Sequence, residues 1–185
     1  GSLILAGSTG LDGYGDIDTF GAAAQAVEGS AFGDVLFGSD TDNRILGRAG
    51  DDTLSGNGGD DVIFGGSGND TIDGGSGFDY LSFQDDGADH TGASSLGVTV
   101  NLATGTVTDR FGDTDSVSNM EGVIGSEEND VLIGDSANNN LFARGGDDDV
   151  NGGDGNDVLA GGSGNDTLSG AQGDDVLIGD IGDDT

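Results

Sequence analysis

Three nonapeptides decide the fold: GGSGNDTID at residues 65–73, GGDGNDVLA at residues 152–160 and GGSGNDTLS at residues 161–169. Each opens with glycines, carries an aspartate at its sixth position and an aliphatic residue at its eighth. Because glycine, asparagine and aspartate tolerate left-handed backbone conformations, the first six residues predict a tight turn. The last three residues predict a short strand whose middle side chain points inward.

The nonapeptide recurs in phase along two ladders, thirteen units in all. Its sixth-position residues are Asp34, Asn43, Asp52, Asp61, Asp70 and Asp79 in the first ladder, and Asp130, Asn139, Asp148, Asp157, Asp166, Asp175 and Asp184 in the second. A large aliphatic residue stands two positions after each of the first twelve, from Leu36 to Leu177. One such strand cannot bury its apolar face alone, so the sequence predicts stacked copies around a continuous aliphatic file.

The composition excludes several classes of protein. The chain has 40 glycines, no cysteine or proline, and 36 acidic residues against 4 basic ones, for a formal net charge of −32. This charge excludes nucleic-acid binding, and the absence of cysteine excludes disulfides and thiolate metal sites. No apolar run approaches the roughly 20 residues of a membrane span, so membrane insertion is not expected. Carboxylates crowded into turns repel one another, which indicates that the chain needs a counter-ion.

The pattern GGxGxDxUx, where U is a large aliphatic residue, resembles the repeats of RTX (repeats-in-toxin, hemolysin-type) calcium-binding proteins. The resemblance covers residues 29–82 and 125–185. It implies an all-β fold, a parallel β-roll or right-handed β-solenoid of tandem nonapeptide repeats. Two nonapeptides form one coil in that family, so repeats two apart are neighbours in the stack. One Ca²⁺ lies between each neighbouring pair of turns.

The resemblance also implies the ligands. The earlier turn gives its sixth-position carboxylate and the carbonyls of its second and fourth residues, and the later turn gives its aspartate and the carbonyls of its first and third. Such oxygen ligands suit Ca²⁺ better than Mg²⁺, and about six to nine ions are expected. The implied metal-site residues are Asp34, Arg48, Gly50, Asp52, Asn57, Gly59, Asp61, Gly65, Ser67, Asp70, Gly74, Ser76, Asp79, Asp130, Arg144, Gly146, Asp148, Gly153, Gly155, Asp157, Gly161, Gly162, Ser163, Gly164, Asp166, Gly170, Gln172, Asp175, Gly179, Ile181 and Asp184.

The first two units of each ladder depart from the pattern. Asn43 and Asn139 replace the sixth-position aspartate, and most of the turn glycines are missing from residues 29–34, 38–43, 125–130 and 134–139. We expect these units to act as capping turns that hold the strand phase more than the metal. The pairings of Asp34 with Asp52 and of Asp130 with Asp148 therefore rank below the others.

A longer duplication divides the chain. Residues 97–102 alternate like a strand, and Thr104-Gly105 predicts a hairpin turn into residues 106–108. The N-terminus matches this insert at an offset of 97 residues, as in Leu5-Ala6 and Leu102-Ala103. The predicted organisation is a truncated capping segment (1–28), a first β-roll (29–82), a capping insert with a β-hairpin (83–124) and a second β-roll whose last repeat is truncated (125–185).

The roles of other polar groups are open to more than one interpretation. The phased aspartates could form a solvated acidic face, although random charge would not repeat every nine residues. Asp113, Asp115 and Glu121 form either an extra calcium site or turn-capping hydrogen bonds. His90 is expected in an exposed loop, and the four arginines are expected to be local charge partners.

The leading functional prediction is a non-catalytic, calcium-binding segment of a large secreted bacterial protein, extracellular or at the cell surface. No HExxH, GxSxG or P-loop motif is present, so no enzyme is expected. Without metal the carboxylates oppose folding, and with extracellular calcium the turns close. RTX proteins typically leave the cell unfolded by type I secretion, which the composition suits. The alternatives are a calcium-dependent polysaccharide-binding accessory module and a surface-layer or adhesin spacer with cell-surface neighbours.

Overall fold

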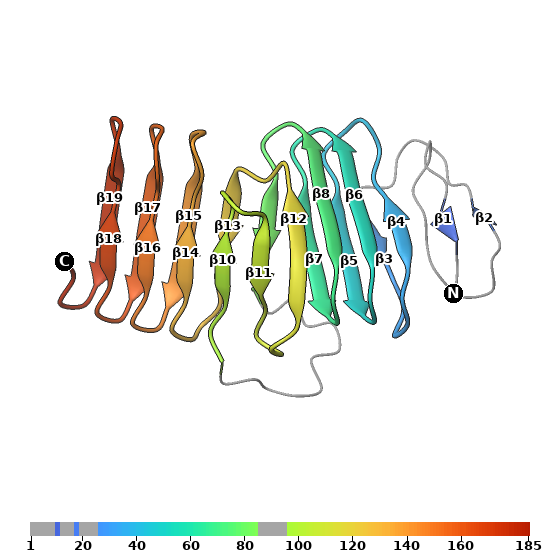
Figure 1. Ribbon diagram of the computed structural model, residues 1–185, viewed down its shortest axis with the longest axis horizontal. Helices are drawn as coiled ribbons and strands as arrows, with labels where there is room; N and C mark the ends of the chain where they lie inside the picture. Colours follow the sequence, from blue (N-terminus) through green and yellow to red (C-terminus); the bar gives the residue numbers. More distant parts are fainter. Residues whose placement is uncertain (1–9, 12–16, 19–25, 85–95) are drawn as a thin grey trace. The chain divides into compact units, whose positions relative to one another are not determined.

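The computed structural model describes residues 10–11, 17–18, 26–84 and 96–185, and every regular element in these ranges is a β-strand (Figure 1). The chain divides into two compact units, residues 1–81 with 113–120 and residues 82–112 with 121–185. Among the described residues, no helix is long and apolar enough to cross a membrane. His90 lies outside the described residues, as does most of the expected capping segment 1–28.

The first unit is built from two sheets that the chain visits alternately. One contains, in spatial order, β12 (Thr114–Ser118), β8 (Thr71–Ser76), β6 (Thr53–Gly58), β4 (Val35–Phe37), β1 (Gly10–Leu11) and β2 (Ile17–Asp18). The other contains β9 (Tyr80–Ser82), β7 (Val62–Ser67), β5 (Arg44–Ala49) and β3 (Ala26–Glu28). From β3 to β9, each strand of one sheet is therefore followed, after a short turn, by a strand of the other.

Parallel pairing joins residues 18 apart. Leu36 lies opposite Leu54 and Leu54 opposite Ile72 in one sheet, and Ile45 lies opposite Ile63 in the other. Eighteen residues are two nonapeptides, so one coil contains two repeats, and repeats two apart are neighbours. The predicted parallel β-solenoid is confirmed.

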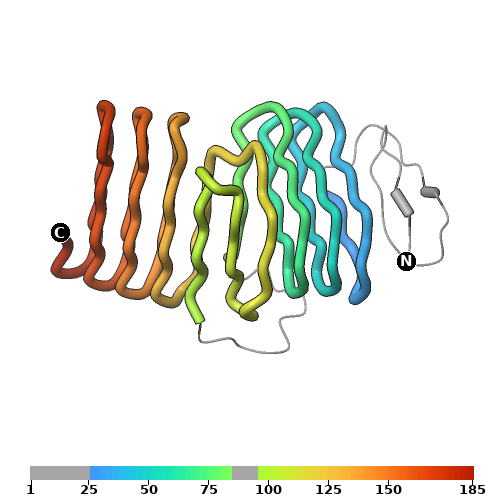
Figure 2. The backbone as a smooth tube through the Cα atoms, viewed as in Figure 1, coloured from blue at the N-terminus to red at the C-terminus, as the bar shows by residue number. Residues whose placement is uncertain are grey.

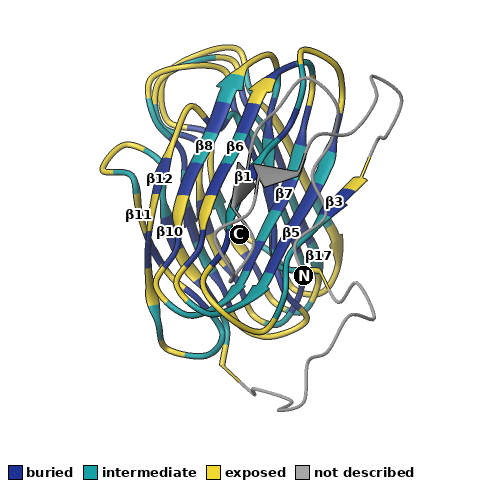
Figure 3. Cartoon of the chain, turned by 90° about the vertical axis from the view of Figure 1, so that its right-hand side faces the viewer, coloured by how far each residue is buried: buried dark blue, intermediate teal, exposed yellow. Residues whose placement is uncertain are grey.

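The eighth-position side chains form the core. Val27, Leu36, Ile45, Leu54, Ile63, Ile72 and Leu81 are each at most 1 % exposed. In Figure 3 the buried positions run along the strands and exposed positions gather at the turns. Burying one such side chain contributes about 1.5–3 kcal/mol, so the file of aliphatic residues is the main apolar contribution to stability.

A segment distant in sequence extends this unit. β12 pairs in parallel with β8, with Val117 opposite Ile72 at an offset of 45 residues. Val117 is 7 % exposed and takes the inward position. The expected insert 83–124 is thus divided, because residues 113–120 belong to the first unit and the rest to the second.

The second unit repeats the same plan. One sheet contains β18 (Thr167–Ser169), β16 (Asp149–Asn151), β14 (Val131–Ile133), β10 (Thr99–Asn101) and β11 (Thr106–Thr108). The other contains β19 (Val176–Ile181), β17 (Val158–Ser163), β15 (Asn140–Gly145) and β13 (Gly122–Ile124). Figure 2 shows its last coils as successive rungs. Leu132, Leu141, Val150 and Leu159 are fully buried.

The two ends of this unit differ from its middle. β10 and β11 form the predicted hairpin, with Thr99 opposite Thr108, and β10 then pairs in parallel with β14. At the other end, β19 is an edge strand, and its Leu177 is 46 % exposed where its counterpart Leu159 is fully buried. At this end an inward aliphatic side chain is therefore fully buried only where a neighbouring coil packs on each side of its own coil.

Candidate metal sites

The sixth-position aspartates form a buried ladder between neighbouring turns. From Asp52 to Asp79 and from Asp148 to Asp184, each uses its Oδ1 atom to accept the backbone N–H of the sixth-position residue 18 places earlier. The N–H of Asp52 donates to Asp70 at 2.9 Å, and the N–H of Asp148 donates to Asp166 at 2.9 Å. From Asp34 to Asp166 these side chains are at most 5 % exposed. The stacking register thus brings carboxylates together inside the turns.

Nine turns share one backbone conformation. Their second and fourth residues have positive φ angles, for example 81° at Arg48 and 107° at Gly50. These are the turns that begin at residues 47, 56, 65, 74, 143, 152, 161, 170 and 179. We call them left-handed turns.

The left-handed turns approach one another closely. A Cβ atom on Gly66 would collide with the carbonyl oxygen of Arg48, and one on Gly68 with that of Gly50. The second- and fourth-position carbonyls of one turn therefore face the next turn. At Gly66 and Gly68 glycine is therefore favoured for space as well as for its φ angle, whereas Ala171 and Asp180 take the second position of the last two turns with positive φ angles.

The second carboxylate oxygen is buried without a hydrogen-bond partner in the five left-handed turns that face a later left-handed turn. It is the Oδ2 atom of Asp52, Asp61, Asp148, Asp157 and Asp166. Around Gly47, a Cβ atom would collide with both Asp52 Oδ2 and the carbonyl oxygen of Gly65, the first residue of the next turn. Two acceptors with no donor between them are costly to bury, and a cation is the natural partner.

Burial perturbs the acidity of these groups. It raises the pKa of Asp52, Asp61 and Asp148 from 3.8 to about 7, and neighbouring carboxylates add to the rise. The pKa values of Asp130 and Asp157 are also raised, with burial as the largest cause. A proton or a cation is therefore favoured at the carboxylate ladder.

The four degenerate turns satisfy their sixth residue internally, and we call them self-capped turns. The N–H and Oγ of Ser30 donate to Asp34 Oδ2 at 2.6 and 2.9 Å. The N–H of Ser126 donates to Asp130 Oδ2 and its Oγ to Asp130 Oδ1, both at 2.7 Å. In the other two turns a second-position N–H donates to the Oδ1 of Asn43 or Asn139. None of these four described turns has a positive φ at its second or fourth residue. A backbone donor thus stands where the left-handed turns leave an oxygen unpaired.

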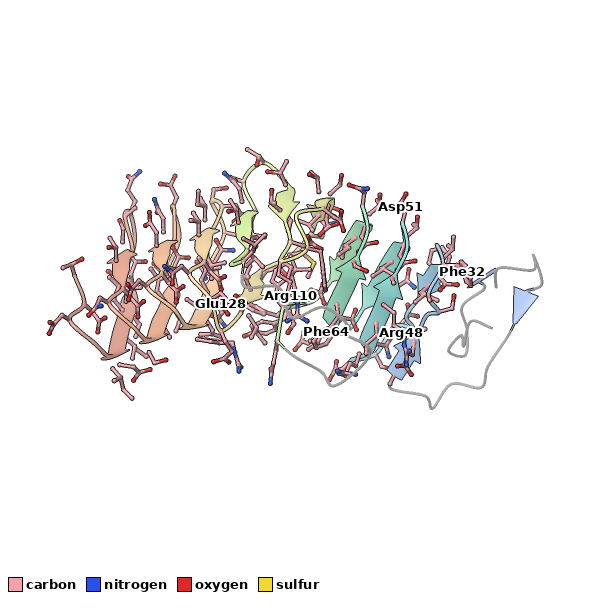
Figure 4. The ribbon with its side chains drawn as sticks, turned by 90° about the horizontal axis from the view of Figure 1, so that it is seen from below. Phe32, Arg48, Asp51, Phe64, Arg110 and Glu128 are labelled. Carbon is pink, nitrogen blue, oxygen red and sulfur yellow. The ribbon has the colours of Figure 1, made fainter. Side chains whose placement is uncertain are left out.

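Arginine marks the change from one kind of turn to the other. Arg48, labelled in Figure 4, and Arg144 are the second residues of the first left-handed turn in each ladder. They form ion pairs with Glu28 and Glu127. Their Nε atoms donate at 2.8 and 2.9 Å. Their side chains are local charge partners, as predicted, and only their backbone carbonyls face a neighbouring turn.

The other two arginines lie against aromatic rings. The Arg44 guanidinium lies 4.5 Å from the centroid of Phe64, and that of Arg110 lies 5.4 Å from the centroid of Phe111. These cation–π contacts leave both arginines away from the carboxylate ladder.

Five gaps between neighbouring turns have a left-handed turn on both sides. They contain the aspartate pairs Asp52 and Asp70, Asp61 and Asp79, Asp148 and Asp166, Asp157 and Asp175, and Asp166 and Asp184. The earlier aspartate of each pair is one of the five with an unpartnered Oδ2. Among the described residues, no group of three or more acidic, histidine or cysteine side chains is placed so that it could hold one metal ion. Two carboxylates with several carbonyls in each gap form a donor set of hard oxygen atoms, which fits Ca²⁺.

The predicted residues fall into two groups. Those from Arg48 to Asp79 and from Arg144 to Asp184 lie in left-handed turns, whereas Asp34 and Asp130 lie in self-capped turns. The sequence interpretation did not find that Asp115 accepts the N–H of Asp70 at 2.9 Å, the position that a repeat aspartate would take. A signal was present, because Val117 follows Asp115 by two positions, as in the repeats.

Comparisons with known proteins agree with this geometry. The RTX calcium-binding nonapeptide repeat matches in four copies, at residues 28–62, 46–81, 124–159 and 151–185, together more than half of the chain. No curated protein matches the chain by sequence. Among solved structures, the extracellular lipase LipA from Serratia marcescens is similar at 19 % identity and a TM-score of 0.42 over 87 % of this chain. The match spans 33 % of the lipase. The chain belongs to the RTX calcium-binding nonapeptide repeat family.

Proposed function

We propose that the chain is a non-catalytic calcium-binding β-roll segment of a secreted bacterial protein, and that it completes its folding when calcium binds outside the cell. One observation carries the proposal. In each of the five gaps flanked by left-handed turns, the earlier aspartate has a buried Oδ2 without a hydrogen-bond partner. In the self-capped turns the equivalent oxygen accepts a hydrogen bond.

Each of the five gaps would hold one ion. The ligands would be both aspartates, the second and fourth carbonyls of the earlier turn, and the first and third carbonyls of the later turn. The gap between residues 47–52 and 65–70 illustrates the set, with Asp52, Asp70 and the carbonyls of Arg48, Gly50, Gly65 and Ser67. The four gaps that follow a self-capped turn, including those of Asp34 and Asp130, are assigned no ion. The proposed count is therefore five, below the six to nine expected from the repeats.

Bound calcium would supply the positive charge that the buried carboxylates lack. Five ions carry ten positive charges, which would reduce the formal net charge from −32 to −22. Without them, ionised aspartates at neighbouring positions repel one another while their desolvation opposes burial. Sites of this charge and flexibility suit the roughly millimolar calcium found outside cells. Low cytoplasmic calcium would keep the chain unfolded until export.

The non-catalytic part of the proposal rests on the assignment of the carboxylates. The buried sixth-position aspartates are accounted for by the ladder, and the sequence has no lysine, no cysteine and no nucleophile elbow. Lipase activity is a property named for the Serratia protein, of which the matched part is a third. No feature of the described surface favours a polysaccharide or surface-layer partner, so the proposed ligand is calcium alone.

Counting the bound ions tests the proposal. The full chain is equilibrated by dialysis against 2 mM Ca²⁺, and bound calcium is measured by elemental analysis. We expect about five ions per chain, and about two in a variant with Asp157→Ala and Asp166→Ala, because these two aspartates serve three gaps. Unchanged calcium content in that variant would refute the assignment, as would wild-type protein that binds no calcium.

A further inference from the structure

A second ladder of side chains runs beside the first. It is made by the fifth-position residues, most of which are asparagine or aspartate. In eight cases the backbone N–H of a fifth-position residue donates to the Oδ1 atom of the residue 18 places earlier, at 2.8–3.1 Å. In a ninth case the N–H of Thr114 donates to the Oδ1 atom of Asn69 at 3.1 Å. The donors are Asp60, Asn69, Phe78, Thr114, Asp147, Asn156, Asn165, Asp174 and Asp183. We call this the outer ladder, because its side chains, such as Asp51, lie exposed at the turn surface.

The hydrogen bonds of the two ladders run in opposite directions between neighbouring turns. In the buried ladder the earlier turn donates, as when the N–H of Asp148 reaches Asp166 at 2.9 Å. In the outer ladder the later turn donates, as when the N–H of Asn165 reaches Asp147 at 2.8 Å. Both bonds span the same gap from adjacent residues. Together they restrain the separation of the turns and their lateral offset.

The outer ladder does not follow the proposed calcium sites. It also spans gaps that begin with a self-capped turn, where the N–H of Asp60 donates to Asp42 and that of Asn156 to Asn138. It extends to the returning segment, where the N–H of Thr114 donates to Asn69 at 3.1 Å. A contact present in gaps with and without a calcium site is a property of the stack itself.

We infer that the fifth-position asparagines and aspartates are positioning residues for the calcium gaps. They hold adjacent turns at the spacing where carboxylates and carbonyls face one another, before any ion is present. The inference rests on the proposed function, because it names what prepares those sites. Either an amide or a carboxylate supplies the Oδ1 acceptor, so the polar acceptor matters here and the charge does not.

The test uses the two last gaps of the second unit. Asn156→Ala and Asn165→Ala together remove the acceptors of Asp174 and Asp183. The variant also loses the hydrogen bond from Asn165 Nδ2 to Asp147 at 3.1 Å. In a calcium titration followed by circular dichroism, the midpoint should rise about two- to fivefold, from three lost hydrogen bonds shared over three coupled ions. Calcium content at saturation should stay at the wild-type value, because no ligand is changed.

Two further variants separate positioning from general damage. Asn156→Asp with Asn165→Asp keeps the acceptors and should restore the midpoint to within about twofold of wild type. The control is Asp174→Ala with Asp183→Ala, which alters the fifth position of the last two turns. No later described residue donates to these side chains, so this pair should shift the calcium midpoint less than Asn156→Ala with Asn165→Ala. An unchanged midpoint in the Asn156→Ala, Asn165→Ala variant, or an equal shift in the control, overturns the inference.

Failure of the proposed function has a different signature. If wild-type protein shows no calcium transition, folding is instead induced in chelator with trimethylamine N-oxide, which favours compact states. The Asn156→Ala, Asn165→Ala variant should then need more osmolyte than wild type, and the aspartate variant should not. Equal osmolyte midpoints for wild type and the alanine variant would refute the outer ladder independently of calcium.

Discussion

Replacing Asp61 by asparagine changes one buried oxygen of the carboxylate ladder to an amide nitrogen. Asp61 is fully buried, and its Oδ1 accepts the N–H of Asn43 at 2.7 Å. Its Oδ2 has no partner and lies close to the carbonyl oxygen of Gly74, since a Cβ atom on Gly56 would collide with both. An amide keeps the first contact and places a donor opposite that carbonyl. The substitution therefore favours the metal-free fold and disfavours the ion.

The size of the first effect follows from the pKa. Burial, with repulsion from Asp79, Asp42 and Asp60, raises the pKa of Asp61 from 3.8 to about 7. At pH 7.5 this rise corresponds to at most about 4 kcal/mol of destabilisation by the ionised group. Solvent screening lowers the figure, and we expect Asp61→Asn to stabilise the metal-free fold by about 2 kcal/mol. The second effect is the loss of one ion, because Asp61 serves a single proposed gap.

Two measurements check this prediction, with Asp60→Asn as the matched control. Asp60 is the exposed neighbour, and its amide would still accept the N–H of Phe78. In chelator, Asp61→Asn should fold at a lower concentration of trimethylamine N-oxide than wild type, and bound calcium should fall by one ion per chain. Asp60→Asn should leave bound calcium unchanged and should lower the osmolyte midpoint by much less than Asp61→Asn, because Asp60 is the smallest of the causes that raise the pKa of Asp61. Equal effects of the two substitutions, or a less stable metal-free Asp61→Asn variant, would refute the reasoning.

Three further predictions follow from burial, capping and acidity. Leu159→Ala should lower the free energy of unfolding in calcium by about 2–5 kcal/mol in a urea titration, and Leu177→Ala by less than about 1 kcal/mol, because only Leu159 is fully buried; equal losses would contradict the core assignment. Ser126→Ala removes a 2.7 Å hydrogen bond to Asp130 and should cost about 1 kcal/mol without changing bound calcium; a lost ion would place a metal at that self-capped turn. Protonation of the three buried aspartates with a pKa near 7 stabilises the metal-free fold below about pH 4, and this contribution is lost as the pH rises through 7. Circular dichroism in chelator should therefore show more β-structure at pH 5 than at pH 8, and an unchanged or falling signal on acidification would contradict the burial of these groups.

The stacking of the repeats could be predicted from the sequence because it depends on periodicity. The nine-residue spacing places Ile45 opposite Ile63, and the structure pairs these residues in parallel. The hairpin of residues 99–108 followed from alternation and a Thr-Gly turn. In both cases the signal is local, or it repeats often enough to be recognised without coordinates.

Other features depend on backbone direction, which the residue types alone do not determine. Glycine content suggested that turn 125–130 is degenerate, but only the structure shows that the N–H of Ser126 points at Asp130. The docking of β12 on β8 crosses 45 residues and joins a segment that lacks the GGxG pattern. The outer ladder could not be predicted from the sequence, because position five has no fixed residue type in the GGxGxDxUx pattern. It depends on which backbone N–H faces which side chain, and only the structure shows that.

The most direct test of the account is a calcium titration of the chelated chain, followed by far-ultraviolet circular dichroism with magnesium as the control. The account predicts a cooperative coil-to-β transition at sub-millimolar to millimolar Ca²⁺, roughly the range of extracellular sites, and none with Mg²⁺. A chain that is already β-structured in chelator and unresponsive to calcium would contradict it, and the ladders would then be a solvated acidic solenoid.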